Sequence, residues 1–145
     1  MNLINIFNPL MIWLLRSPLH RIASKNTLLV TFFGRKSRKK YTTPVNYVLD
    51  GNVIFITSLR SRTWWKNLRG GAPVSIHLKG NVMETYGEVI ENSEKVTEQL
   101  MGYLQKVPQY AKYFKIGLDP NGHPNPEDVT HAAQERVMIL LRLNI

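Results

Sequence analysis

The sequence predicts a mainly β protein of the α+β class, in which antiparallel strands form a small closed or partly closed barrel with inserted helices. Short runs rich in β-branched and aromatic residues alternate with turn residues along most of the chain. The turn sequences DG at residues 50–51 and KGN at residues 79–81 each lie between two such runs, as hairpin turns do. A sustained helical spacing of apolar residues appears only after Asn92. Several antiparallel strands interrupted by helices are typical of small barrels.

The predicted strands are apolar segments bounded by glycine, proline, asparagine or charged residues. They are residues 27–33 (TLLVTFF), 41–49 (YTTPVNYVL), 52–58 (NVIFITS), 73–78 (PVSIHL), 82–90 (VMETYGEVI) and 135–144 (ERVMILLRLN). Pro44 lies inside the second segment. Because proline has no N–H for a strand ladder, Pro44 requires an edge strand, a bulge or a backbone that faces something other than a strand.

Three helical segments are predicted between the strands. Residues 63–69 (TWWKNLR) form a short helix that stops at two glycines. A longer helix begins with Ser93 as its N-cap and continues to Val107, before Pro108 interrupts it. Residues 109–115 (QYAKYFK) form a second helical piece, and a polar loop with three prolines runs from Gly117 to Asp128.

The chain of 145 residues is expected to form one domain, with an apolar helix within residues 1–22 and the barrel in residues 27–145. It contains no cysteine, which excludes disulfides, a thiol nucleophile, a zinc ribbon and an iron–sulfur cluster. A reducing compartment fits this composition, so we expect a cytoplasmic protein.

The segment from Leu3 to Leu15 is apolar but shorter than the roughly 20 residues of a membrane-spanning helix. Basic residues follow it rather than precede it, unlike a secretory signal. Asn8 and Pro9 suit the N-cap and first position of a short helix. Two interpretations stay open. The helix packs on its own domain or on the second subunit of a homodimer, or it contacts the inner face of a membrane peripherally.

The net charge of +9 is unevenly distributed along the chain. Residues 1–80 hold 13 basic residues and one acid, whereas residues 81–145 hold 6 basic and 9 acidic residues. The first half therefore suits a polyanion, either a nucleic acid, an anionic lipid or a phosphorylated or polyacidic cofactor. The cations gather at a basic turn and around two tryptophans. The turn holds Arg35, Lys36, Arg38, Lys39 and Lys40, and the second group, Arg60, Arg62, Lys66 and Arg69, flanks Trp64 and Trp65.

No motif for metal-dependent or nucleophilic catalysis is visible. The four histidines, His20, His77, His123 and His131, lack the helical spacing of a zinc protease, and we predict no metal site. A nucleophile elbow, a P-loop and a dinucleotide-binding glycine fingerprint are also absent.

The order of the motifs in this region resembles the deazaflavin-dependent nitroreductase family. The similarity lies in GRKSRKKYTTPVNYVLDG (residues 34–51) followed by TSLRSRTWWKNLRGGAPVSIHLKG (residues 57–80), and it extends over roughly residues 28–89. It implies a split β-barrel of about six antiparallel strands, related to the pyridoxamine phosphate oxidases. It also implies coenzyme F420, a deazaflavin, or alternatively FMN as the cofactor.

The resemblance assigns cofactor-binding roles to positions of the family motif. These positions are Arg35, Lys36, Lys39, Thr43, Pro44, Val45, Ser58, Arg60, Trp64 and Asn67. Arg35 and Lys36 would bind the phosphate or acidic tail, and Thr43 to Val45 would lie along the ring system. Lys39 and Arg60 stand in for basic residues that the family carries at neighbouring positions. Arg38 departs from the family pattern, which has glycine there.

Ser58, Tyr110 and Tyr113 are the expected catalytic residues. The resemblance places Ser58 near the ring and the two tyrosines around the acceptor pocket. A serine or tyrosine hydroxyl could donate a hydrogen bond to the charge that develops on the acceptor.

The resemblance implies a reductase that transfers a hydride from the reduced cofactor to a small electron-poor acceptor, such as a nitro compound, an enone or a quinone. One alternative is a split barrel that binds a cofactor or tetrapyrrole without this reduction. A nucleic-acid-binding module is disfavoured, because the cations cluster at two loop sites instead of spreading along one face. We therefore expect no nucleic acid partner.

Overall fold

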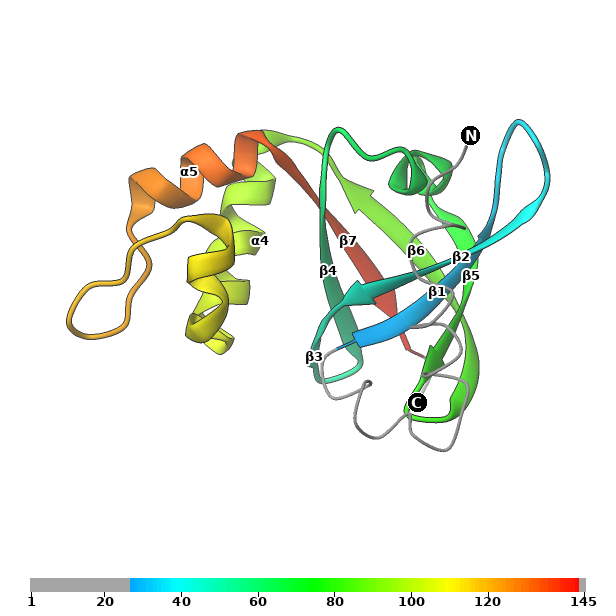
Figure 1. Cartoon of the computed structure of the whole chain (residues 1–145), viewed down its shortest axis with the longest axis horizontal. Helices are drawn as coiled ribbons and strands as arrows, with labels where there is room; N and C mark the ends of the chain where they lie inside the picture. Colours follow the sequence, from blue (N-terminus) through cyan, green and yellow to red (C-terminus); the bar gives the residue numbers. More distant parts are fainter. Residues whose placement is uncertain (1–26, 144–145) are drawn as a thin grey trace.

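The computed structural model describes residues 27–143, and in this part of the chain seven antiparallel strands form one curled sheet (Figure 1). Its strand order is β2-β1-β5-β6-β7-β4-β3. The strands are β1 (Thr27–Phe33), β2 (Lys40–Asn46), β3 (Val48–Asp50), β4 (Val53–Leu59), β5 (Ala72–Leu78), β6 (Asn81–Ile90) and β7 (Arg136–Arg142). The helices are η1 (Trp64–Leu68), α4 (Ser93–Lys106), η2 (Pro108–Phe114) and α5 (Pro126–Gln134), of which η1 and η2 are 3₁₀ helices. The curled sheet is a half-barrel, which confirms the mainly β, split-barrel prediction.

The sheet has seven strands, one more than the predicted number, because the predicted strand 41–49 is divided at Tyr47. β2 ends at Asn46 and pairs with β1, whereas β3 begins at Val48 and pairs with β4. These partners lie near opposite ends of the strand order, so one straight strand could not pair with both. Tyr47, only 6% exposed, packs into the barrel core at the crossing.

β2 is an edge strand of this sheet, as Pro44 required. Pro44 stands opposite Leu29 of β1, and in the described chain β2 has no ladder partner on its other side. On that outer side of β2, the N–H that Pro44 lacks is not needed for a strand ladder.

Two apolar cores share β7 between them. Alternate residues of β7, Val137, Ile139 and Leu141, lie in the core of the barrel. Met138 and Leu140 point the other way and pack with residues of α4, η2 and α5. Because both faces of β7 are buried, this strand is a continuous apolar run instead of an alternating one. Figure 1 shows α4, η2 and α5 together on one side of the barrel, apart from η1.

Most predicted boundaries differ from the structure by one or two residues, and the predicted loop after Gly117 is too long. The loop from Gly117 to Asp128 ends at Asn125, whose side chain accepts a hydrogen bond from the Asp128 N–H at 3.0 Å and caps α5. Pro126 at the first helical position of α5 completes a start signal that the loop assignment overlooked. At α4, Asn92 is the N-cap rather than Ser93. The final strand begins at Arg136 and ends at Arg142, slightly inside the predicted 135–144.

The predicted helix within residues 1–22 and the apolar segment from Leu3 to Leu15 lie outside the described residues. Between residues 27 and 143, no helix is long and apolar enough to cross a membrane.

Candidate functional site

A cavity of about 350 Å³ lies at the open seam of the half-barrel, between edge strand β2 and strand β4. We call it the seam cavity. Its lining comprises Thr43, Pro44, Val45, Asn46, Thr57, Ser58, Leu59, Arg62, Trp64, Tyr103, Tyr110, Tyr113, Phe114 and Arg136. The volume falls within the range of roughly 300–1,000 Å³ that is usual for small-molecule sites. The barrel supplies one wall of the cavity and the helices supply the other.

The barrel wall brings buried hydroxyl groups to the cavity. Thr43 on β2 and Ser58 on β4 are 3% and 4% exposed. The Ser58 hydroxyl donates to the Leu59 carbonyl at 3.2 Å, and the Thr43 hydroxyl donates to the Pro44 carbonyl at 3.4 Å. Since a hydroxyl has one proton, Ser58 must turn away from the Leu59 carbonyl before it can donate to a ligand.

The helical wall is a cluster of aromatic side chains. The ring centroids of Tyr103 and Tyr110 lie 6.2 Å apart, and those of Tyr110 and Tyr113 lie 6.0 Å apart. Tyr103 also meets Phe114 edge-to-face at 6.1 Å. Pro108 ends α4 and starts η2, which turns Tyr110 and Tyr113 toward the barrel. Burial raises the pKa of Tyr103 to about 12, so its hydroxyl stays protonated at neutral pH.

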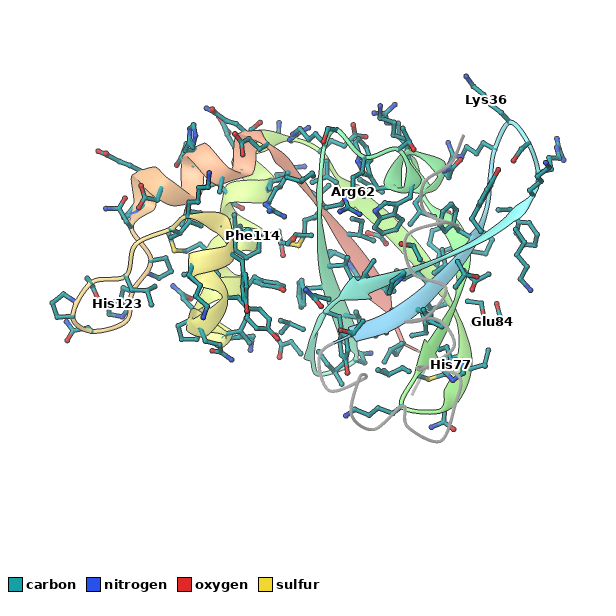
Figure 2. All side chains as sticks on the ribbon, in the orientation of Figure 1. Lys36, Arg62, His77, Glu84, Phe114 and His123 are labelled. Atoms are coloured by element: carbon teal, nitrogen blue, oxygen red, sulfur yellow. The ribbon has the colours of Figure 1, made fainter. Side chains whose placement is uncertain are left out.

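Two arginines also line the cavity, Arg62 on the loop after β4 and Arg136 at the start of β7. Arg136, the first residue of β7, is half-buried, with its guanidinium carbon 4.4 Å from the centroid of the Phe114 ring. Its Nη1 donates to Thr57 Oγ1 at 3.4 Å. Burial lowers the pKa of Arg136; Glu135 and Tyr103 oppose this shift, and Arg62 adds to it. In Figure 2, Arg62 lies on the barrel side of the molecule and Phe114 on the helical side.

The basic turn lies elsewhere, beside a second cavity of about 470 Å³ that we call the turn cavity. It is lined by Phe32, Phe33, Gly34, Arg35, Arg38, Asn67, Leu68, Ala72 and Pro73. The Arg35 N–H donates to Asn67 Oδ1 at 3.1 Å, and its guanidinium donates to the carbonyls of Arg69 and Gly71. These bonds fix the turn against η1 and the chain that follows it. Figure 2 shows Lys36 at the outer tip of the turn.

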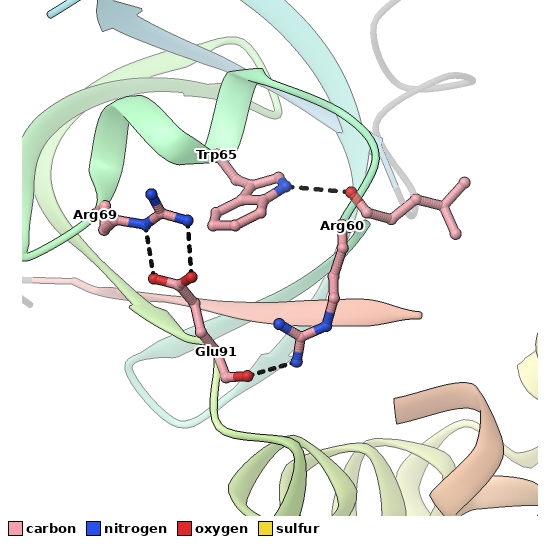
Figure 3. A network of polar contacts seen from close by, with 5 residues as sticks. Arg60, Trp65, Arg69 and Glu91 are labelled. Atoms are coloured by element: carbon pink, nitrogen blue, oxygen red, sulfur yellow. Dashed lines mark hydrogen bonds and ion pairs between the residues drawn. The ribbon is translucent and has the colours of Figure 1, made fainter. Parts of the chain in front are cut away.

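Arg60 belongs to a network on the other side of η1 (Figure 3). Its guanidinium donates to the Glu91 carbonyl, and the Glu91 carboxylate accepts two hydrogen bonds of 2.9 Å from Arg69. The Trp65 indole N–H donates to the Leu59 carbonyl at 3.2 Å. We call Arg60, Trp65, Arg69 and Glu91 the Glu91 network. Arg60 does not line the seam cavity; Arg62, two residues further on, does.

The structure therefore divides the predicted site residues into three groups. Those at the seam cavity are Thr43, Pro44, Val45, Ser58, Trp64, Tyr110 and Tyr113. Arg35 and Asn67 line the turn cavity. Lys36, Lys39 and Arg60 line neither. Because Trp64 and Asn67 both belong to η1, this short helix contributes to both cavities.

Sequence reasoning did not assign site roles to Arg62, Tyr103, Phe114 and Arg136, although all four line the seam cavity. A charged residue at the head of the apolar strand RVMILLR was the available signal for Arg136. Tyr103 lies within the helix predicted between Ser93 and Val107, where its sequence position gives no separate signal of a site role. Within residues 27–143, no three His, Cys, Asp or Glu side chains form a group that could hold a metal ion.

Comparison with known proteins gives likenesses in structure only. No family model and no curated protein sequence matches the chain. A solved structure described as a domain-swapped dimer has a TM-score of 0.53 at 16% identity, over 91% of this chain and 98% of that one. The FAD and heme binding protein from Mycobacterium smegmatis has a TM-score of 0.52 at 12% identity, over 89% and 67% of the two chains. An F420-H2 dependent reductase (FDR-A) has a TM-score of 0.48 at 18% identity, over 80% and 94%. At these identities the likeness concerns the fold alone.

Proposed function

We propose that the protein is a flavin- or deazaflavin-dependent reductase, with coenzyme F420 or alternatively FMN as its cofactor. It transfers a hydride from the reduced cofactor to a small electron-poor acceptor such as a nitro compound, an enone or a quinone. The main support is that residues of β2, β4, η1 and η2, which the sequence resemblance assigns to cofactor and acceptor, line one cavity. The likeness to the solved structure described as an FAD and heme binding protein, at a TM-score of 0.52, supports a flavin-type cofactor.

The seam cavity suits a planar heteroaromatic ring. Among residues 27–143, no strand pairs with the outer edge of β2, so backbone groups on that edge can meet the polar atoms of a ring. Val45 and Trp64 add apolar surface on the barrel side. The anionic tail would lie toward the turn cavity, where Arg35 and Asn67 lie and where Lys36 and Lys39 extend from the same turn.

When bound, the reduced cofactor supplies the hydride, which carries two electrons to the acceptor, and the acceptor then takes up a proton. The protein orients the two partners and excludes water with the aromatic wall. Ser58, Tyr110 or Tyr113 would donate a hydrogen bond to the negative charge that develops on the acceptor. Ser58 can do so after its hydroxyl turns from the Leu59 carbonyl.

Titration of the purified protein with F420, FMN and FAD, followed by the absorbance and fluorescence of each cofactor, tests the proposal. We expect one of them to bind at micromolar concentration. Ser58→Val should weaken binding at least tenfold, because it removes a polar group from the cavity and adds a methyl group. Thr85→Val is the matched control, since Thr85 is a buried strand hydroxyl, 9% exposed, that lines neither cavity. Failure of all three cofactors to bind would overturn the proposal.

A second candidate function is a barrel that binds a cofactor or tetrapyrrole without the reduction. The likeness to an FAD and heme binding protein, at a TM-score of 0.52, supports it. The same titration with heme separates the two functions. Binding of heme but of none of the three flavin-type cofactors would favour this alternative. Binding of F420 or FMN with no turnover of a nitro compound or quinone by the loaded protein would also favour it.

A further inference from the structure

The charged groups that line the seam cavity are all of one sign. Arg62 and Arg136 carry two positive charges, and in the described chain no Asp or Glu belongs to the lining. Neither arginine takes part in an ion pair between described residues. By contrast, the arginines Arg69 and Arg142 each meet a glutamate.

Arg136 is the better placed of the two cations for binding an anion. Its guanidinium carbon lies over the Phe114 ring, 4.4 Å from the ring centroid. Of the five N–H groups of the guanidinium, one donates to Thr57 at 3.4 Å, the one side-chain hydrogen bond of Arg136 within residues 27–143. Glu135 is exposed and acts on Arg136 without forming an ion pair. The edge of the guanidinium is thus left with unused donors at the cavity.

A half-buried cation without an anion is costly, because it loses hydration and gains no partner. A carboxylate is the natural complement, since its two oxygens match the planar fork of an arginine and bind it in a bidentate way. Arg62, on the loop between β4 and η1, adds a second positive charge at the same cavity. The helical wall, with Tyr103, Tyr110 and Tyr113, favours an aromatic body on the same ligand.

We propose that the acceptor reduced in the seam cavity is an aromatic carboxylate, and that Arg136, assisted by Arg62, binds its carboxylate group. This inference rests on the proposed reductase function, because it assigns the substrate class of that site. The carboxylate then lies beside Arg136 and Arg62, which come from barrel strand β7 and from the loop after β4, and the aromatic body of the acceptor lies against the helical wall. Arg136 is a binding and specificity residue here and takes no part in hydride transfer.

Isothermal titration calorimetry with 4-nitrobenzoate and 4-nitrobenzamide tests the inference on the full-length protein, both as purified and saturated with whichever cofactor binds. The two probes have nearly the same shape and differ in the negative charge. We expect the wild-type protein to bind the carboxylate at least tenfold more tightly than the amide. Arg136→Met should abolish this preference. Equal affinities in the wild-type protein, or an undiminished preference in Arg136→Met, would overturn the inference.

Arg142→Met is the matched control. It removes one positive charge from the other end of the same strand, outside both cavities, and should keep the full preference. Near-ultraviolet circular dichroism establishes whether each variant is folded. If Arg136→Met is unfolded, Arg62→Met, on an exposed loop position, gives the second test. It should reduce the preference at least threefold, and an unchanged preference would refute the paired arginine site.

A cofactor phosphate is the competing source of the anion, and titration with FMN and riboflavin distinguishes it. If Arg136 binds the acceptor, Arg136→Met changes the affinities for FMN and riboflavin equally. Selective weakening of FMN would mean that Arg136 binds the cofactor phosphate, and the assignment to the acceptor would be wrong. The failures of the two proposals are distinguishable. Cofactor binding without carboxylate preference refutes only this inference. Carboxylate preference without cofactor binding refutes the reductase, and with it the carboxylate as a reduced acceptor, but retains Arg136 as a carboxylate-binding residue.

Discussion

The seam cavity and the Glu91 network both contain arginines, but the partners of these arginines differ. In the Glu91 network, Arg69 forms two hydrogen bonds of 2.9 Å with the Glu91 carboxylate and lies 5.1 Å from the ring centroid of Trp65. Arg60 donates to the Glu91 carbonyl beside it (Figure 3). At the seam cavity, Arg136 has an aromatic ring and one hydroxyl but no carboxylate.

This difference separates cations that hold the fold together from cations that remain available for a ligand. The bonds of the Glu91 network join the loop after β4 to η1 and to the end of β6, so their partners are all internal. At the seam cavity, no residue between 27 and 143 supplies a carboxylate to Arg136, and we propose a ligand as its partner. Changes in the network should therefore affect stability, and changes at the cavity should affect binding.

The largest expected effect is that of Trp65→Ala. Trp65 is 2% exposed, belongs to the barrel core and donates to the Leu59 carbonyl. Its removal should lower the free energy of unfolding by about 3–5 kcal/mol, measured by urea denaturation. Trp65→Phe is the control, and it should cost clearly less because it retains a ring. A loss below about 1 kcal/mol for the alanine variant would show that the network does not hold the fold.

Tyr103 should give the next largest effect, through its ionisation. Burial raises its pKa to about 12 from the ordinary value of 10.0, so the folded protein holds this proton more tightly than the unfolded chain. The resulting stabilisation is complete below pH 10 and is lost as the pH rises toward 12, by roughly 2 kcal/mol.

The absorbance of tyrosinate measures the pKa of Tyr103, and urea denaturation at several alkaline pH values measures the free energy of unfolding. Each is taken as a difference between the wild-type protein and Tyr103→Phe. Arg136 lowers the pKa of Tyr103, so Arg136→Met should raise that pKa further. An unchanged pKa of Tyr103 in Arg136→Met would contradict the claim that the Arg136 charge acts on the Tyr103 hydroxyl.

Most of the fold could be predicted because its signals are local. Turn residues bound nearly every strand, and the predicted 27–33 coincides with β1. The division of residues 41–49 at Tyr47 could not be predicted, because it depends on which distant strands β2 and β3 pair with. The start of α5 was overlooked although its signal, Asn125 followed by Pro126, is local.

The candidate site divides in the same way. Pro44, Ser58 and Trp64 lie within one continuous motif, so a resemblance in that motif could assign them. Arg136 approaches the cavity from the far end of the sequence, and its exposure, its aromatic neighbour and its lack of an acid are properties of the packed structure. The difference between Arg60 and Arg62 depends on the course of one loop, which the spacing of charges does not determine.

Arg60→Met should have a smaller effect than the loss of Trp65. The substitution removes the charged hydrogen bond to the Glu91 carbonyl, but it also relieves the Arg60 Nε, which is buried without a partner in the described chain. We expect a net loss of about 1–2 kcal/mol in the free energy of unfolding. Urea denaturation measures the loss, and cofactor affinity should stay unchanged. A selective loss of cofactor affinity would show that Arg60 binds the cofactor.

The smallest expected effect on stability is that of Arg136→Met, which brings the two regions into direct comparison. The variant loses the contact with Phe114 and a long hydrogen bond to Thr57, together about 1 kcal/mol. It also removes a half-buried charge that has no anion, which is favourable by a similar amount. The free energy of unfolding should therefore stay within about 1 kcal/mol of the wild-type value. Arg60→Met and Arg136→Met each exchange one partly buried arginine for methionine, so the two losses of stability can be compared directly. A loss for Arg136→Met as large as that for Arg60→Met would mean that Arg136 supports the fold, and the distinction between the two clusters would fail.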